Sequence, residues 1–387
     1  MTFPARDANS PTAGPAYADL DAASSEPMHP AAREVLMSAI DQGYADPRRL
    51  HHGARTARLL LDNAREVVAS SLGVRTGEVT FTSSGTDAVH RGLLGLMRGR
   101  ERAGHTLVHS AVEHSAVLHA ARWAQAPTLA VRVTTHGLIT PEAVQEALSA
   151  GDEPVGVLAV QHANHEVGTV QPVAEIAAAT DIPMFVDACA STGRLPLPDG
   201  WAVAAASAHK WGGPAGVGVL LVRTGARWRN AFPADDRVDE RSSGFENVPA
   251  ALAAAAALQA VVEESAERGA REFAMVERIR HAVARLPDVE VVGDPVLRLP
   301  HLVTFSCLYV DGEALVHELD RRGFGVASGS ACTASTLEPS HVLAAMGVLT
   351  HGNVRLAVGR STTDDDVSAF LAALPDVVTE LRARVGL

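Results

Sequence analysis

The chain has 387 residues, more than one ordinary domain, so we expect a large domain and a smaller one. Its net charge is −12 and its arginines are scattered among acidic residues, which argues against direct nucleic-acid binding. The sequence has no apolar run of about eighteen residues and no signal-peptide core near its start, so we expect a soluble protein that does not enter membranes. Three cysteines, without a C-x-x-C pair or zinc spacing, indicate a reducing cytoplasm and no metal site.

The first part of the chain predicts an α/β fold. Residues 1–16 are rich in Pro, Ala, Ser and Gly, and we expect them to be disordered. From there to residue 230, apolar β-branched runs alternate with helix-like stretches, with strands expected at 78–83, 105–110, 155–162 and 184–188. This alternation indicates a mainly parallel sheet flanked by helices. Polar residues follow these strands, at the sheet edge where such folds bind ligands.

The last part of the chain predicts a smaller α+β domain. An Ala-rich helical segment at about 248–286 leads to expected strands at 302–310 and 353–359, with a helix between them at 311–323. We place the domain boundary near residue 255. The large domain then covers 17–255, with its first residues able to pack against the small domain, which covers 256–387. The run 364–366 is expected to begin a helix, because acidic residues favour the first turn.

Lys210 is the first candidate for a catalytic residue. It lies in SAHKWGGPAGVGVLLV (207–222), on an expected polar loop before glycines and a strand. A lysine that reaches a crevice at a strand end can form a Schiff base with an aldehyde cofactor. The same sequence could also form an ordinary turn with a solvated lysine.

Three further segments favour a pyridoxal phosphate (PLP) site. Asp187 ends an expected strand, where its carboxylate can hold the pyridine nitrogen of PLP protonated, although Asp also serves as a helix N-cap. TSSGTD (82–87) joins a strand to a helix and can cradle a phosphate, although such turns are common. His114 follows another strand and can stack on a ring, or it can be a structural histidine.

Five segments together resemble one family. They are SAHK, VDA, SAVEHSAVL (110–118), HANHEVGTVQP (162–172) and SGSACTASTLEPSHVL (328–343). The combination resembles the NifS/IscS-like cysteine desulfurases, which belong to the class V aminotransferase group of fold-type I PLP enzymes. The resemblance extends from about Leu20 to Thr363, and its most specific element is the segment 328–343.

The resemblance implies a role for each matching position. Lys210 matches the lysine that bonds to the cofactor, Asp187 the partner of the pyridine nitrogen, and His114 the histidine that stacks on the ring and is a candidate acid or base. Arg355 matches the arginine that binds the substrate carboxylate, and Cys332 the mobile nucleophile. The remaining matches are phosphate-binding positions, Gly85, Thr86, Ser207 and His209, and positions near the phenolic oxygen, Asn164 and His165. The family forms homodimers with active sites near the subunit interface.

The chain departs from the family pattern at several positions. It has Asn-His-Glu at 164–166 where the family has Asn-Asn-Glu, and Ala190 where the family has glutamine. We expect His165 to replace the lost contact with the phenolic oxygen of the cofactor. Phe245 stands where the family has a threonine that reaches the phosphate of the partner subunit. One phosphate contact is therefore expected to be lost, unless Ser242 or Ser243 provides it. The linker from the 328–343 motif to Arg355 is also shorter than in the family.

The resemblance therefore implies a cysteine desulfurase that converts L-cysteine to L-alanine and holds the sulfur on Cys332 as a persulfide, for an acceptor protein of unknown identity. A selenocysteine lyase, another PLP-dependent C–S lyase and a non-catalytic scaffold of a sulfur pathway are the alternatives. Cys189 and Cys307 lie in apolar, strand-like context and are expected in the core. Cys189 comes two residues after Asp187, so it can also approach the cofactor.

Overall fold

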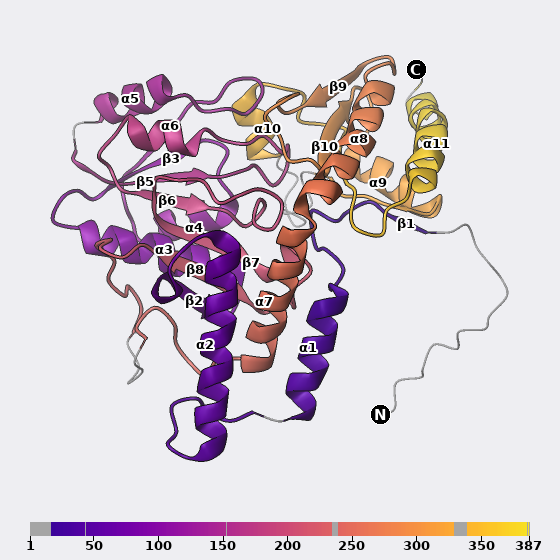
Figure 1. Cartoon of the computed structure of the whole chain (residues 1–387). Coiled ribbons are helices and arrows are strands. Elements are labelled where there is room, and N and C mark those ends of the chain that lie inside the picture. The colour runs from indigo at the N-terminus through magenta and orange to yellow at the C-terminus, as the bar shows by residue number, and fades with distance from the viewer. Residues whose placement is uncertain are drawn as a thin grey trace.

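The structure is a computed structural model that describes residues 17–42, 44–151, 153–233, 239–328, 339–384 and 386 (Figure 1). Its largest sheet has seven strands in the order β2-β8-β7-β6-β5-β3-β4. These are β2 (Val79–Thr82), β3 (Thr106–Ser110), β4 (Thr128–Val131), β5 (Val155–Gln161), β6 (Met184–Asp187), β7 (Trp201–Ser207) and β8 (Gly218–Val222). β8 runs antiparallel to both of its neighbours, β2 and β7, and the other neighbouring strands of this sheet pair in parallel. The mainly parallel sheet that the sequence predicts is confirmed.

Helices cover both faces of this sheet. They are α1 (Pro30–Asp41), α2 (His52–Leu72), α3 (Gly85–Arg100), α4 (Ser115–Trp123), α5 (Pro141–Ala150), α6 (Val173–Ala178) and α7 (Val248–Glu263), with short 3₁₀ turns η1 (Thr76–Glu78) and η2 (Ala208–Lys210). Alternate residues of a strand point to opposite faces. In β6, for example, Met184 and Val186 belong to the core beneath α2 and α7, whereas Phe185 packs against α3 and α4.

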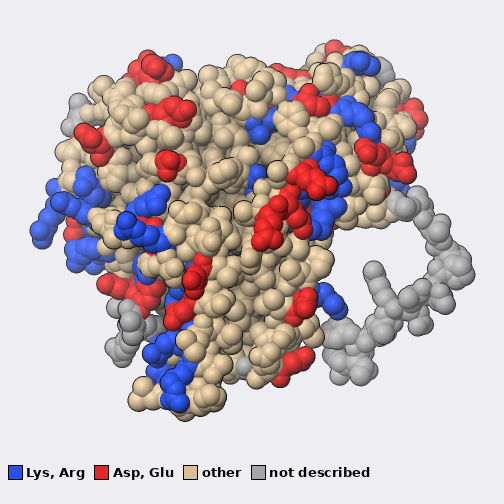
Figure 2. All heavy atoms as spheres, viewed as in Figure 1, with Lys and Arg blue, Asp and Glu red and all other residues tan. Residues whose placement is uncertain are grey.

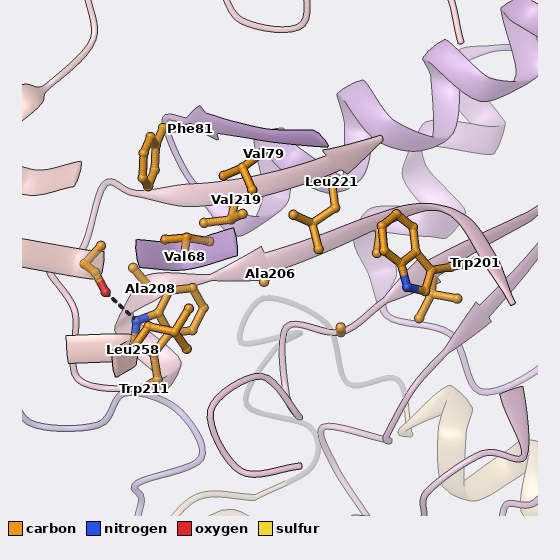
Figure 3. Close-up of a cluster of buried hydrophobic side chains, with 14 of the residues drawn as sticks. Val68, Val79, Phe81, Trp201, Ala206, Ala208, Trp211, Val219, Leu221 and Leu258 are labelled. Carbon is orange, nitrogen blue, oxygen red and sulfur yellow. Dashed lines mark hydrogen bonds between the residues drawn. The ribbon is translucent and has the colours of Figure 1, made fainter. Parts of the chain in front are cut away.

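The core beneath α7 holds the loop that carries Lys210 (Figure 3). Trp211, the next residue, is fully buried, and its indole Nε1 donates a hydrogen bond to Ala254 O at 3.0 Å. Leu258 of the same helix belongs to the same cluster as Trp211. Because a buried, hydrogen-bonded tryptophan fixes the backbone on either side, Lys210 is held at a defined place at the end of β7.

The C-terminal part contains a three-stranded antiparallel sheet, β12-β10-β9, formed by β9 (Val289–Val292), β10 (Leu302–Cys307) and β12 (Asn353–Ala357). Its helices are α8 (Ser265–Val283), α9 (Gly312–Arg321), α10 (His341–Met346) and α11 (Asp364–Ala383). Near the N-terminus, β1 (Ala18–Asp19) pairs in parallel with β11 (Phe324–Gly325), and Ala18 together with the following Leu20 joins this C-terminal core. Val261 belongs to the core of the seven-stranded sheet, whereas Met275 belongs to the core of the C-terminal part. The domain boundary near 255 stays a prediction.

The Ala-rich segment is helical, as expected, but it forms two helices. α7 and α8 meet at Glu264 with a bend of 71°. Ser265 Oγ donates to Val262 O at 2.7 Å, a local contact of the kind that bends helices. Among the described residues, no single helix has the length and apolar composition of a membrane span, and only the bent pair α7–α8 meets that test when joined.

The ends of the elements follow local sequence signals. α11 begins with the predicted acidic residues 364–366, and Thr363 forms a capping box with Asp366. Cys307 is buried in β10, as expected. On the face shown in Figure 2, acidic and basic side chains are interspersed. The predicted disorder of 1–16 concerns residues outside the described part of the chain, as does the role of Cys332.

Candidate active site

A cavity of about 320 Å³ lies at the carboxyl ends of the parallel strands. Its lining includes nine residues that the sequence predicts for the site, which are Gly85, Thr86, His114, His165, Asp187, Ser207, His209, Lys210 and Arg355. A larger hollow, about 490 Å³, lies near Thr106 and Gly156 at the opposite ends of β3 and β5, and none of these nine residues lines it. The strand-end cavity is therefore the candidate active site.

Lys210 is the only lysine of the 387-residue chain. It ends η2 and lines the cavity, where its Nζ donates to Ala23 O at 2.6 Å and to Ser24 O at 3.0 Å. The segment before α1 thus contributes Ser24 to the cavity lining and contacts the one side-chain amine of the protein. This contact joins residues 187 positions apart.

Asp187 is buried at the end of β6, opposite Gln161 of β5. Its Oδ1 accepts a hydrogen bond from Cys189 N at 2.9 Å. A second carboxyl group lies nearby, because Glu113 Oε1 accepts from Gln161 N at 2.7 Å. Burial, followed by the charge of Asp187, raises the pKa of Glu113 well above its usual value. The neutral form of Glu113 is therefore favoured.

Two imidazole rings meet in the cavity. The centroids of His114 and His165 are 4.8 Å apart, and the rings meet edge to face at 72°. His114 is the N-cap of α4, and its Nδ1 accepts from Ala116 N at 3.1 Å. Burial lowers the pKa of His114, although the charge of Asp187 opposes the shift, and burial lowers the pKa of His165 well below its usual value. Both rings are therefore neutral at pH 7.

The N-terminus of α3 forms one wall of the cavity. Ser84 is its N-cap, with Oγ accepting from Asp87 N at 3.0 Å, and Gly85 follows. A Cβ atom at Gly85 would lie 2.5 Å from Ser207 Cβ, so only glycine fits there without displacement. Ser207 Oγ lies 3.0 Å from His209 Nδ1. Hydroxyls, an imidazole and a helix N-terminus together form a cradle for an anion such as a phosphate.

Arg355 lies in β12 and reaches the cavity from the C-terminal sheet. Its Nη2 donates to Ser24 Oγ at 2.6 Å and to Asp21 Oδ1 at 2.8 Å, and its Nη1 donates to His165 O at 3.1 Å. The guanidinium is buried and held by three acceptors. An arginine fixed in this way presents a planar set of donors that fits a carboxylate.

Asn164 does not line the cavity. Its side chain shapes the loop after β5, because Oδ1 accepts from the backbone N of Glu166 and of Val167, both at 2.8 Å, and Nδ2 donates to Val112 O at 3.1 Å. Its role as a cofactor contact stays a prediction. The segment that contains Cys332 is outside the described residues.

Three polar residues that line the cavity, Ser24, Ser84 and Gln161, are not among the residues predicted for the site, and neither is Asp21, which pairs with Arg355. Ser84 and Gln161 lie at or just after the ends of strands, so the strand-end pattern that predicts their neighbours also indicates them. Asp21 and Ser24 carry no local signal, since they reach Arg355 from the far end of the chain.

Cys189 lines the cavity and packs against the core beside it. Burial and the charge of Asp187 raise the pKa of its thiol well above its usual value, and burial raises the pKa of Cys307 to about 11. Neither thiol therefore provides a thiolate at pH 7. Within the described part of the chain, no group of three or more His, Cys, Asp or Glu side chains could hold a metal ion.

The model of the aminotransferase class-V family matches residues 17–370, so the chain belongs to this family and is an enzyme of it. The chain is 35% identical over 381 residues to the IscS-like cysteine desulfurase of Mycobacterium tuberculosis, with 94% of the chain and 96% of the relative covered. It is 31% identical over 376 residues to the cysteine desulfurase IscS of Dictyoglomus turgidum, covering 94% of the chain and 95% of the relative.

A solved structure shows the same fold. A NifS-like protein that is 25% identical has a TM-score of 0.85, with 94% of this chain and all of that chain covered. The resemblance inferred from the sequence is confirmed, and so is the fold class.

Proposed function

We propose that this enzyme is a PLP-dependent cysteine desulfurase that converts L-cysteine to L-alanine and takes the sulfur onto Cys332 as a persulfide. One observation carries the proposal: the only lysine of the chain lines a strand-end cavity together with the carboxylate of Asp187 and the anion cradle at Gly85. A lysine, a carboxylate and an anion cradle are the three groups that PLP requires. The similarity to proteins named cysteine desulfurase supports the substrate.

The described residues fit PLP. The cavity volume of about 320 Å³ falls in the range of small-molecule sites. Lys210 would bond to the aldehyde, Asp187 would pair with the ring nitrogen, and His114 would cover a face of the ring. The cradle of Gly85, Thr86, Ser207 and His209 would hold the phosphate, and His165 would approach the phenolic oxygen. When bound, the protonated pyridine ring supplies a sink for the electrons of the substrate's Cα–H bond.

The protein orients the substrate and moves its protons. Arg355 binds the carboxylate of cysteine, and its three acceptors keep the guanidinium in one orientation. Lys210 Nζ takes the proton from Cα and returns a proton during formation of alanine. His114, a neutral imidazole because burial lowers its pKa, can accept the proton of the substrate thiol.

Sulfur transfer needs a thiolate that can reach the substrate. The thiolate of Cys332 attacks the sulfur of cysteine, so an S–S bond forms, the Cβ–S bond breaks, and the carbon skeleton leaves as alanine after gaining a proton. Cysteine and one thiol thereby become alanine and one persulfide. Cys189 is closer to Asp187 in sequence, but the raised pKa of its buried thiol makes it unsuitable as the nucleophile.

The proposal extends to the assembly and its partners. The enzyme forms a homodimer in the cytoplasm and hands its persulfide sulfur to an acceptor protein. A chain with three cysteines and no paired motif is suited to a reducing compartment, which keeps Cys332 available as a thiol.

Borohydride reduction tests the cofactor, and the single lysine makes the result unambiguous. The protein purified with PLP should absorb visible light, and reduction should bleach it and fix one cofactor on the peptide that contains Lys210. Lys210→Ala should carry no fixed cofactor.

Alanine formation tests the reaction class. Cys332→Ala should lose most of the turnover of cysteine to alanine while keeping its bound cofactor. A simple C–S lyase would keep its normal rate in this variant, and a scaffold would show no turnover in the wild type.

A further inference from the structure

Ser340, the N-cap of α10, follows the proposed nucleophile Cys332 by eight positions. The apolar side chains of α10, Val342, Leu343 and Met346, share a core cluster with Val112 and Val167. Val112 immediately precedes Glu113 and His114, and Val167 follows the loop 164–166 that contains His165. α10 therefore packs on the two loops that supply the cavity with the imidazoles of His114 and His165.

Two hydrogen bonds join the start of α10 to the same loops. Ser340 Oγ donates to Glu166 Oε2 at 2.9 Å, and both residues are buried. His341 Nε2 lies 2.9 Å from Glu113 O. The first bond reaches the residue after His165, and the second reaches the residue before His114.

Glu166 is itself fixed at two further points. Its backbone N donates to Asn164 Oδ1 at 2.8 Å, and its backbone O accepts from Thr304 Oγ1 at 2.6 Å. Ser340 Oγ also accepts from Leu343 N at 3.2 Å, so the same hydroxyl caps α10 and contacts the carboxylate. This contact therefore connects two rigid parts of the molecule.

We propose that Glu166 and Ser340 are positioning residues for sulfur transfer: their hydrogen bond fixes the end of the segment that carries Cys332 beside the cavity. The inference rests on the proposed function, because it requires Cys332 to be the nucleophile. A residue acting in this way touches neither substrate nor cofactor. It sets the place from which the thiol must reach the substrate sulfur.

Chain geometry agrees with this role. Eight residues span at most about 28 Å when fully extended. Ser340 bonds to Glu166, and Glu166 adjoins His165, which lines the cavity, so this anchor lies one residue away from the cavity lining. The linker that is shorter than in the family follows the 328–343 motif and therefore lies beyond Ser340. Its length does not limit the reach of Cys332 from this anchor.

A single-turnover experiment on the full-length, PLP-loaded enzyme separates positioning from the steps before it. After mixing with cysteine, the change in cofactor absorption reports substrate binding, and mass spectrometry of quenched samples reports persulfide on Cys332. S340A and E166A should slow persulfide formation about tenfold, the loss expected for one buried hydrogen bond, while the absorption change keeps its rate.

Conservative variants and a matched control sharpen the test. Ser340→Thr and Glu166→Gln each keep a donor or acceptor and should restore persulfide formation to within about threefold of the wild type. Ser306→Ala is the control: it removes a buried hydroxyl that donates to Leu349 O at 3.0 Å, beyond α10, and should have no effect. The double variant S340A/E166A should be no slower than the slower single variant, because one shared contact is lost in each.

Three results overturn the inference. The single variants could form persulfide at the wild-type rate, the two effects could multiply in the double variant, or Ser340→Thr could be as slow as S340A, which would point to capping or packing. If E166A does not fold, the S340A and Ser340→Thr pair decides alone. Failure of the proposed function shows separately, since the wild type itself would then form no persulfide on Cys332.

Discussion

Arg355 Nη2 donates to Asp21 Oδ1 at 2.8 Å, an ion pair between residues 334 positions apart. Asp21 belongs to the same segment as Ala23 and Ser24, whose carbonyl oxygens accept from Lys210 Nζ. One short stretch near the N-terminus therefore contacts both the amine of Lys210 and the guanidinium of Arg355, which the proposed reaction uses. It fixes the guanidinium that is proposed to receive the substrate carboxylate.

We predict that Arg355→Lys raises the KM for cysteine at least about tenfold, with a smaller effect on kcat. A single ammonium cannot reach Asp21, Ser24 and the carbonyl of His165 in the fan-like geometry that the guanidinium uses. Steady-state alanine formation measures the effect. Arg298→Lys is the control, because Arg298 is equally buried and pairs with Glu277 away from the cavity. Equal KM values for the Arg355 variant and the wild type would remove the carboxylate-binding role.

Gly85→Ala should weaken PLP binding at least tenfold, roughly the loss of one contact to a charged phosphate. The added Cβ would lie 2.5 Å from Ser207 Cβ and 2.7 Å from Ser207 Oγ, so the cradle must open. Equilibrium titration of the apoenzyme with PLP, followed by absorbance, gives the Kd. Gly77→Ala is a matched control, since no atom lies within 4 Å of its added Cβ. The cradle assignment fails if both variants bind PLP like the wild type.

His165→Ala should shift the absorption spectrum of the bound cofactor and the apparent pKa of that chromophore. The reason is that the neutral His165 ring is proposed to bond to the phenolic oxygen in place of the amides found in relatives. His165→Asn returns the family's residue and should lie closer to the wild type. A pH titration of absorbance measures both variants, and identical titrations for His165→Ala and the wild type would refute the contact.

Stability should fall on acidification because of buried histidines, and His162 provides the clearest case. Burial lowers its pKa to about 4, against about 6.5 in an unfolded chain. Above pH 6.5 both states are neutral, so His162 does not affect the free energy of unfolding. As the pH falls towards 4, the unfolded state gains a proton that the folded state does not, and the free energy of unfolding decreases.

His162 alone should account for about 2 kcal/mol of the loss in stability between pH 7 and pH 5. Urea denaturation at the two pH values measures this change. His162→Asn can still hydrogen-bond to Ser191, which lies 2.8 Å from the native imidazole, but it does not titrate. The variant should show a pH dependence smaller by about that amount, and an unchanged dependence would show that His162 is not protonated on unfolding.

Much of the fold and cavity could be predicted because the signals are local. The apolar runs of β2, β3, β5 and β6 are near-continuous, as in buried parallel strands, and their carboxyl ends must meet at one edge of the sheet. Polar residues after those strands, such as Asp187 and His114, were therefore placed together correctly. The segment around Lys210 is also a local signal, and it predicts this lysine at a strand end, where the cavity lies.

The contributions of distant segments could not be predicted. Asp21 and Ser24 have no periodicity or motif that marks them, and their place depends on the pairing of β1 with β11. The bonds of the Asn164 side chain within its own loop and to Val112 O likewise carry no local signal, and its expected role near the cofactor stays a prediction. The bend at Glu264 lies beside the contact between Ser265 Oγ and Val262 O, and the Ala-rich pattern of the segment does not indicate a break there.

The most direct test of the central claim is peptide mass spectrometry of the enzyme after a single exposure to L-cysteine, combined with quantification of alanine. We predict one additional sulfur atom on the peptide that contains Cys332, none on the peptides of Cys189 or Cys307, and one alanine for each persulfide. Two results would contradict the account: alanine formed in the predicted amount while Cys332 stays unmodified, or the extra sulfur found on Cys189.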